Sequence, residues 1–257
     1  MSEYILTADE AGVRVITIAR PDKKNALTQA MYAAIIDALE QGDADPRVRV
    51  LVIAAQGGIF TSGNDLADFA ASSAHSDGAP SPAERFPYVL TQTKKPIIVA
   101  VNGPAVGVGV TMLLQCDLVY AADNATFRTP FVDLALVPEG ASSLLMPAAV
   151  GRARANALLL LGDTWTAEDA FAAGLISGVL PVSDLMTAVM ARARALASKA
   201  PGAVRASKAL VNADAPTILD RIRHANAVFA DRISSPEFAE AASAFMMRRP
   251  ADFSNFS

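Results

Sequence analysis

Two glycine-containing segments of the sequence have residue types suited to binding a negatively charged oxygen through their backbone. Residues 60–66 (Phe-Thr-Ser-Gly-Asn-Asp-Leu) follow an apolar run that ends at Ala55, and residues 102–109 (Asn-Gly-Pro-Ala-Val-Gly-Val-Gly) follow another such run. Where a strand turns into a helix, the first N–H groups of the helix lack an internal partner and favour an anion. Two such turns from neighbouring strands could place two donors on one carbonyl oxygen, although each pattern also fits an ordinary turn.

A single glutamate supplies a candidate proton carrier. Glu139 lies between proline and glycine in residues 137–143 (Val-Pro-Glu-Gly-Ala-Ser-Ser), and its flanking residues are mostly apolar. Apolar surroundings favour the neutral form of a carboxyl group and raise its pKa, which suits acid/base work near neutral pH. The alternative is that Glu139 caps a helix that we expect to begin near Ala141, and the local sequence leaves both roles open.

Strand-like and helix-like patterns that would position these segments alternate along the first two thirds of the chain. The expected strands are residues 13–18, 48–55, 97–101 and 117–121. The expected helices are residues 28–42, with Thr28 as N-cap and Gly42 at the end, and residues 108–116. This alternation predicts an α/β fold with mainly parallel strands.

The last third of the chain has helical patterns only. Thr166 and Asp169 have the spacing of a capping box, and Gly174 suits the end of that helix. A long helical pattern follows over residues 183–199. Pro201 and Pro236 each suit a first helical turn, with Ser235 as N-cap for the second helix. We expect this region to pack on the core or on a neighbouring subunit.

One low-complexity stretch, residues 71–85, is small, polar and rich in proline. Such composition predicts a mobile loop. Because the stretch directly follows residues 60–66, it could act as a lid over a ligand, and a plain surface insertion fits equally well.

Composition limits the classes of function. In 257 residues, 52% are hydrophobic and 19% charged, which predicts a packed core. A net charge of −4 argues against nucleic acid as the main partner. One cysteine, Cys116, and two histidines cannot form an internal disulfide or a common zinc site. Without a secretory signal, a membrane-length apolar run or a peroxisomal tripeptide, the chain is expected to be cytoplasmic.

Taken together, the motifs resemble the crotonase (enoyl-CoA hydratase/isomerase) superfamily. The similarity runs from about Arg20 to Phe253. It includes residues 20–27, 60–66, 102–109 followed by Cys116 and Asp117, 171–175 and 248–253, in this order. Among its subgroups, the chain most resembles the peroxisomal-type Δ3,Δ2-enoyl-CoA isomerases. That similarity lies in residues 62–66, 102–107, 125–131 and 138–140.

The resemblance implies an architecture and an assembly. The expected fold is α/β, a crotonase-type spiral of ββα units with a C-terminal helical region. Residues 1–195 would form the crotonase core and residues 196–257 a helical oligomerisation region. A homotrimer or a dimer of trimers is the assembly that the family leads us to expect.

The resemblance also assigns roles to individual residues. Glu139 would be the catalytic base, and the backbone N–H groups of Asn64 and Val108 would form the oxyanion hole. The residues expected to contact the substrate or its CoA group are Lys23, Lys24, Asn25, Ala26, Ser62, Gly63, Asp65, Leu66, Gly107, Phe131 and Arg249. No metal or other cofactor is expected, because the CoA thioester is itself the substrate.

The sequence differs from the hydratases of the family at two positions, and this favours isomerisation over hydration. Hydratases use two glutamates, and the positions that would match them hold Thr111 and Phe131. A one-base shift of a double bond remains possible, so the sequence predicts a Δ3,Δ2-enoyl-CoA isomerase of fatty acid β-oxidation. The alternatives are an enoyl-CoA hydratase or another crotonase-family acyl-CoA enzyme, and, from a different class, a non-catalytic acyl-CoA-binding protein.

Overall fold

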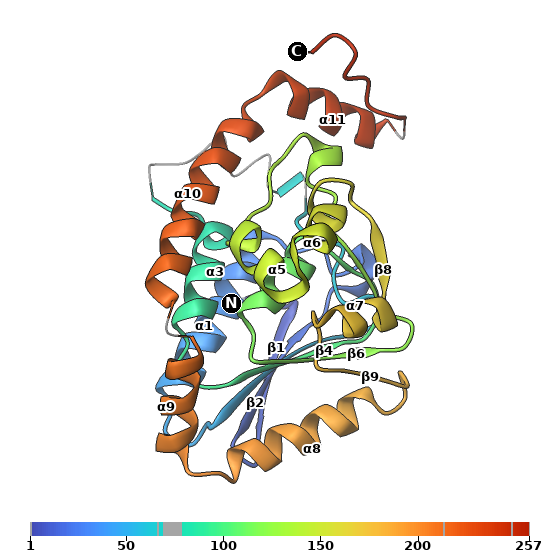
Figure 1. Cartoon of the computed structure of the whole chain (residues 1–257). Helices are drawn as coiled ribbons and strands as arrows, with labels where there is room; N and C mark the ends of the chain where they lie inside the picture. The colour runs from blue at the N-terminus through green and yellow to red at the C-terminus, as the bar shows by residue number, and fades with distance from the viewer. Residues whose placement is uncertain (1, 66, 69–78, 213, 248, 257) are drawn as a thin grey trace.

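A six-stranded sheet forms the centre of the molecule (Figure 1). The computed structural model describes residues 2–65, 67–68, 79–212, 214–247 and 249–256. The strand order is β1 (Ile5–Glu10), β2 (Val13–Ile18), β3 (Val50–Ala55), β4 (Ile97–Val101), β6 (Leu118–Ala122) and β9 (Gly178–Leu180). The first two strands form an antiparallel hairpin, and every later pair in the sheet is parallel. A smaller sheet contains β5 (Ala105–Val106), β7 (Thr126–Arg128) and β8 (Thr164–Thr166).

Both faces of the central strands are covered. In β3, Leu51 and Ile53 belong to the larger apolar cluster, whereas Val50 and Val52 belong to a second cluster on the other face. This alternation, with apolar residues on both sides, explains why β3 and β4 are continuous apolar runs in the sequence. The second cluster is completed by α8 (Leu185–Ala197), which lies along the sheet in Figure 1.

The helices of the core follow the strands in chain order. The larger helices are α1 (Gln29–Ala44), α3 (Pro82–Gln92), α5 (Ser142–Val150), α6 (Arg152–Leu159) and α7 (Ala167–Ala173). Shorter turns are η1 (Pro21–Lys23), α4 (Val108–Thr111), η2 (Met112–Gln115) and η3 (Val132–Leu134). The expected α/β fold with mainly parallel strands is confirmed.

Several predicted helix ends are confirmed by hydrogen bonds. The Thr28 side chain accepts from the Met31 N–H at the start of α1. Thr166 and Asp169 form the predicted capping box of α7, and Gly174 ends that helix in the left-handed conformation. Ser235 accepts from the Phe238 N–H at the start of α11 (Pro236–Met246).

Two predicted boundaries are wrong. The first helix passes Gly42 and ends at Ala44, because Gly42 provides close packing instead of a stop. A Cβ at Gly42 would lie 2.5 Å from Leu51 Cδ2 of β3. The helix expected over residues 108–116 is α-helical for one turn only and then tightens into the 3₁₀ turn η2.

The predicted loop over residues 71–85 is also wrong in its last part. Ser81 is the N-cap of α3 and forms a capping box with Glu84, so residues 82–85 are helical. Residues 71–78, and with them the proposed lid, lie outside the described residues. The hairpin strand β1 was not predicted, because only Ile5 of its residues is buried.

The remaining helices extend from the core (Figure 1). They are α9 (Pro201–Val211), α10 (Ala215–Ile233) and α11. Their exposed large apolar side chains are Leu210, Val211, Phe245, Met246 and Met247. None of the helices in the described ranges has the length and apolar character needed to cross a membrane. The division at residues 195 and 196 stays a prediction.

Candidate active site

The two glycine-containing segments meet at the carboxyl ends of β3 and β4. The Val106 N–H donates to Thr61 O at 3.0 Å, and the Phe60 N–H donates to Pro104 O at 3.0 Å. Thr61 and Ala105 form an isolated parallel bridge. Residues 60–65 and 102–109 are therefore neighbours, as the sequence suggested for two turns that follow adjacent strands.

Close packing of the two segments requires glycine. A Cβ at Gly103 would collide with the carbonyl oxygen of Gly58, which is backbone and cannot rotate away. Gly107 has φ 58° and ψ −117°, a conformation that side chains disfavour. It connects β5 to α4, and its N–H donates to Arg128 O at 2.9 Å. These glycines fix where α4 begins.

Two backbone donors remain at this junction. Within the described part of the chain, the N–H groups of Asn64 and Val108 have no acceptor. Val108 is the first residue of α4 and is buried, and Asn64 is half-buried. Unpaired N–H groups in a partly buried site are suited to binding a carbonyl oxygen on which negative charge develops.

Asn64 is held by a side chain that the sequence analysis did not single out. The Tyr32 hydroxyl of α1 donates to Asn64 Oδ1 at 2.5 Å. The Tyr32 side chain is buried, and its ring packs on Phe86 of α3 with centroids 5.3 Å apart. Burial, together with the charge of Glu139, raises the pKa of Tyr32, so it stays a donor at neutral pH. The sequence did contain an indication of this role, because Tyr32 places a hydroxyl group on the otherwise apolar face of the first helix.

Glu139 contacts α4, the helix that begins at Val108. Its carboxylate accepts a hydrogen bond from the Thr111 hydroxyl, one turn after Val108. Its backbone carbonyl accepts from the N–H and hydroxyl of Ser142 at 3.0 and 2.6 Å. The start of α5, at Ala141, has no side-chain cap. The alternative that the Glu139 side chain caps this helix is therefore wrong.

The surroundings of Glu139 suit proton transfer. Burial raises the pKa of Glu139 to about 6, while the hydrogen bond from Thr111 acts in the opposite direction. A carboxyl group with this pKa is mostly charged at neutral pH and can accept a proton, and its conjugate acid is weak enough to form in a catalytic cycle.

Two predicted contact residues have side chains with structural partners. Asn25 is fully buried, accepts from the Arg20 N–H at 2.8 Å, and donates to the carbonyls of Gln56 and Ile59 at 2.9 and 2.7 Å. Asp65 pairs with Arg20 Nη1 at 2.8 Å, and this partner lowers the pKa of its carboxyl. The two side chains thus tie residues 56–59 and Asp65 to the turn after β2.

The other predicted contact residues differ in exposure. Lys23 and Lys24 are exposed on η1, next to the half-buried Ala26. Arg249 is exposed, and its Nη2 atom donates to Glu240 Oε2 at 2.8 Å. The predicted residues at or near the junction are Ser62, Gly63 and Gly107, all at least partly buried, and Phe131, a buried side chain.

Some positions cannot be placed or assigned. Leu66 lies outside the described residues. Among those that are described, no group of three or more His, Cys, Asp or Glu side chains could hold a metal ion. The contacts of all these residues with CoA stay predictions.

Known proteins define the class to which this fold and site belong. A solved structure of an enoyl-CoA hydratase/isomerase from Pseudoalteromonas atlantica T6c is 40% identical and superimposes with a TM-score of 0.93. That similarity covers 98% of this chain and 100% of the other, so the architecture is the crotonase fold. The family model described as Enoyl-CoA hydratase/isomerase matches residues 8–255, and the chain belongs to this family.

Relatives in the family include isomerases. Rat enoyl-CoA delta isomerase 2 is 37% identical over 254 residues, which are 97% of this chain and 65% of the rat protein. Mouse peroxisomal enoyl-CoA delta isomerase 3 is 34% identical over 253 residues, covering 96% of this chain and 80% of the mouse protein. The chain thus spans about two thirds of the length of the rat relative.

Proposed function

We propose that the chain is a Δ3,Δ2-enoyl-CoA isomerase. The observation that carries this proposal is a single carboxylate, Glu139, beside two unpaired N–H donors. Thr111 contacts this carboxylate at a position where a hydratase of the family would supply an acid. The similarity to rat and mouse enoyl-CoA delta isomerases supports the same reaction.

The proposed reaction begins with a 3-enoyl-CoA whose thioester oxygen accepts from the N–H groups of Asn64 and Val108. The Glu139 carboxylate removes a proton from C2, and the electron pair spreads over a dienolate whose negative charge lies largely on the thioester oxygen. Removing one donor of an oxyanion hole typically costs about 10²–10³ in rate.

Glu139 then completes the cycle as an acid. The protonated carboxyl returns its proton to C4, the double bond forms between C2 and C3, and the product is the 2-trans-enoyl-CoA. One carboxylate suffices, because the same group is first base and then acid. No atom is added or lost, so the reaction requires no co-substrate.

Two features support isomerisation over hydration. The Thr111 hydroxyl is a donor to Glu139 and lacks the acidity of a second carboxyl group. Phe131 is buried where the family pattern would place another acid, and an apolar ring helps to exclude water. Hydration in this family uses a carboxyl pair to activate and deliver water, and the two positions that match this pair hold Thr111 and Phe131.

The proposal also covers CoA binding, the assembly, the pathway and the location of the protein. Lys23 and Lys24 are exposed on η1 beside the junction and would meet the phosphates of CoA. Further parts of the proposal are a homotrimer or dimer of trimers, a place in fatty acid β-oxidation and a cytoplasmic location.

The direct test is an assay with 3-hexenoyl-CoA that follows the conjugated product in the ultraviolet, for wild type and Glu139→Gln. We expect conversion by the wild type and a loss of at least about 10³-fold in the variant, since glutamine cannot accept the proton. The same proteins are assayed with 2-hexenoyl-CoA for 3-hydroxyacyl-CoA. Hydration by the wild type without isomerisation would establish the hydratase alternative. Binding of CoA esters with no turnover of either substrate would establish the non-catalytic one.

A further inference from the structure

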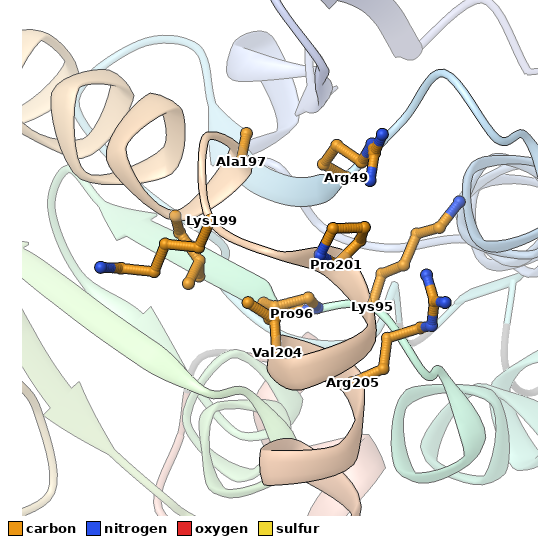
Figure 2. A pocket seen from close by; sticks show the side chains of 9 residues that line it. Arg49, Lys95, Pro96, Ala197, Lys199, Pro201, Val204 and Arg205 are labelled. Carbon is orange, nitrogen blue, oxygen red and sulfur yellow. The ribbon is translucent and has the colours of Figure 1, made fainter.

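A second hollow lies at the opposite edge of the central sheet, where the parallel strands begin. Arg49 directly precedes β3, and Lys94 and Lys95 precede β4. The turn from α8 to α9 brings Lys199 and Arg205 to the same place. Figure 2 shows Arg49, Lys95, Lys199 and Arg205 among the residues that line the hollow, which the reaction proposed for Glu139 does not use.

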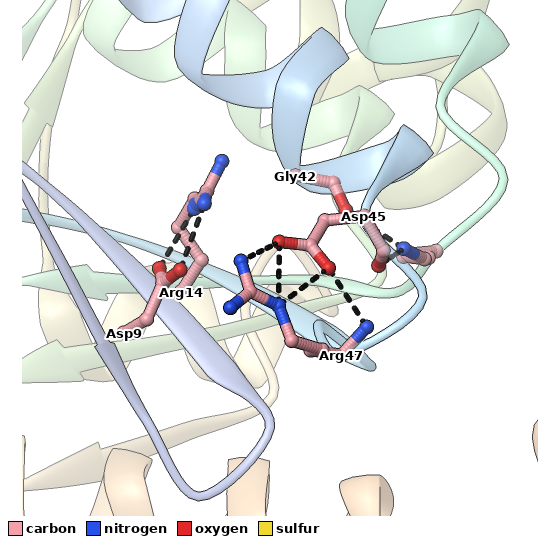
Figure 3. Close-up of polar contacts among 6 residues, drawn as sticks. Asp9, Arg14, Gly42, Asp45 and Arg47 are labelled. Atoms are coloured by element: carbon pink, nitrogen blue, oxygen red, sulfur yellow. Dashed lines mark hydrogen bonds and ion pairs between the residues drawn. The ribbon is translucent and has the colours of Figure 1, made fainter.

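Most of the cations at this edge have no carboxylate partner. Within the ranges that the structure describes, Arg49, Lys94, Lys199 and Arg205 form no ion pair. Two nearby arginines, by contrast, do have carboxylate partners. Arg14 pairs with Asp9 and Arg47 pairs with Asp45, each at 2.7 Å (Figure 3). The four cations without an ion pair therefore line one hollow, in a chain whose net charge is −4.

Lys95 adds a buried positive charge beneath this surface. Its ammonium group donates to the carbonyls of Gly42 and Asp45 at 2.7 and 2.6 Å. Burial lowers its pKa, the charges of Asp43 and Asp45 act in the opposite direction, and the charge of Arg205 acts in the same direction as burial. Asp43, the acidic residue among those that line the hollow, accepts from the N–H groups of Lys94 and Lys95 at 3.1 and 2.9 Å. One engaged carboxylate does not balance the cations around it.

The shape and the backbone also favour an anion. Two adjoining cavities share Arg49, Lys95, Pro201 and Arg205, and the larger has a volume of about 380 Å³. Small-molecule sites commonly have about 300–1,000 Å³. The helix α9 begins at Pro201, and its N-cap Ala200 provides no side-chain acceptor. The positive end of the helix dipole therefore adds to the side-chain charges.

We propose that this hollow binds a small molecule that carries phosphate groups. Arginine guanidinium groups bind phosphate oxygens in pairs, and lysines add charge without a fixed geometry. Arg49 and Arg205 line both cavities, so the hollow offers two guanidinium groups to the phosphates. The site is distinct from the pocket of Glu139, because it lies at the other end of the same strands.

The test is a calorimetric titration of the full chain with inorganic pyrophosphate. The site variant is Arg49→Ser with Arg205→Ser, and the matched control is Arg152→Ser with Arg154→Ser, two exposed arginines of α6. We expect saturable one-to-one binding by wild type and control, and at least a tenfold weaker affinity in the site variant. Circular dichroism checks that all three proteins are folded.

Three results would overturn the proposal. Equal affinity in all three proteins, or heat that never saturates, would show only general screening of surface charge. A raised KM for 3-hexenoyl-CoA in the site variant would show that these cations serve the acyl-CoA substrate. Adenosine diphosphate is titrated as a second probe. Binding tenfold tighter than pyrophosphate would identify a nucleotide as the source of the phosphates, and equal binding would identify the free diphosphate group.

Discussion

Burial and a hydrogen bond act in opposite directions on the proton affinity of Glu139. Burial raises the pKa of its carboxyl to about 6, and the Thr111 hydroxyl stabilises the charged form. Under the proposed reaction the free protein must carry the charged form to accept a proton. We expect kcat/KM for 3-hexenoyl-CoA to rise with pH through about 6 and to level off above pH 7.

Thr111→Val removes the hydroxyl and keeps the shape of the side chain. Since the hydrogen bond to Thr111 lowers the pKa of Glu139, its loss should move the rising limb of the pH profile to higher pH. The measurement is kcat/KM against pH for both proteins. A limb at an unchanged pH would mean that this hydrogen bond does not set the protonation of Glu139.

The hydrogen bond between Tyr32 and Asn64 should also affect the rate of the proposed reaction. Tyr32→Phe leaves Asn64 Oδ1 without its donor, which costs about 1–3 kcal/mol if the group stays buried. We expect kcat to fall roughly tenfold, because about 1.4 kcal/mol corresponds to a factor of ten. Asn64→Ala keeps its backbone N–H and should cause a similar loss.

The double variant Tyr32→Phe, Asn64→Ala distinguishes positioning from packing. If Tyr32 acts only through Asn64, the double variant should be no slower than either single variant. Losses that multiply, or a lower melting temperature with unchanged kcat, would assign Tyr32 to core packing alone.

At the scale of elements, the contact between residues 58 and 103 holds the two donor segments together. Gly103→Ala would push a methyl group into the Gly58 carbonyl. Overpacking of this kind costs about 1–3 kcal/mol. We expect a lower melting temperature and a loss of isomerase activity, because the spacing between the Asn64 and Val108 donors changes.

Gly58→Ala is the matched control for that experiment. A Cβ at Gly58 meets nothing within 4 Å. We expect a change in stability within about 0.5 kcal/mol and unchanged activity. Equal damage from both substitutions would show that the close approach is not what holds the segments.

The same elements show how far the sequence could be interpreted. Strands such as β4 were predicted because their apolar runs are local features, and helix starts such as Thr28 because the cap is local too. Gly42 was mistaken for a helix end, because its packing on Leu51 forms only when α1 folds against the strand that follows it. The helix α3 was missed because serine and proline at its start also suit a loop.

In the site, too, the sequence indicated some features and not others. Glu139 was singled out by its apolar surroundings, and Asn64 and Val108 by the family resemblance; their roles stay predictions. The hydrogen bond from Tyr32 to Asn64 could not, because it joins α1 to a segment over thirty residues away. The partner of Glu139 was also hidden, since Thr111 contacts it only after α4 and residues 137–140 are folded together.

At the scale of the whole molecule, the C-terminal helices leave apolar side chains in water. Phe245, Met246 and Met247 are exposed at the end of α11, with exposed fractions of 61%, 78% and 70%. A cluster of this kind favours burial against another copy of the chain. We expect gel filtration with light scattering to give a trimer or a multiple of it. Phe245→Glu should shift the protein toward a smaller mass, and a wild-type monomer would contradict the proposed assembly.

The single carboxylate has a stereochemical consequence. Thr111 and Phe131 stand at the two positions where a hydratase of the family would have acids, and the proposed reaction uses Glu139 alone. If one group both takes and returns the proton, C2 and C4 must be reached from the same face. A deuteron removed from C2 would then reappear at C4 of the same molecule, to the extent that Glu139 returns it before exchange with solvent. The label retained in the product thus reports how well the folded pocket keeps water away from its own acid.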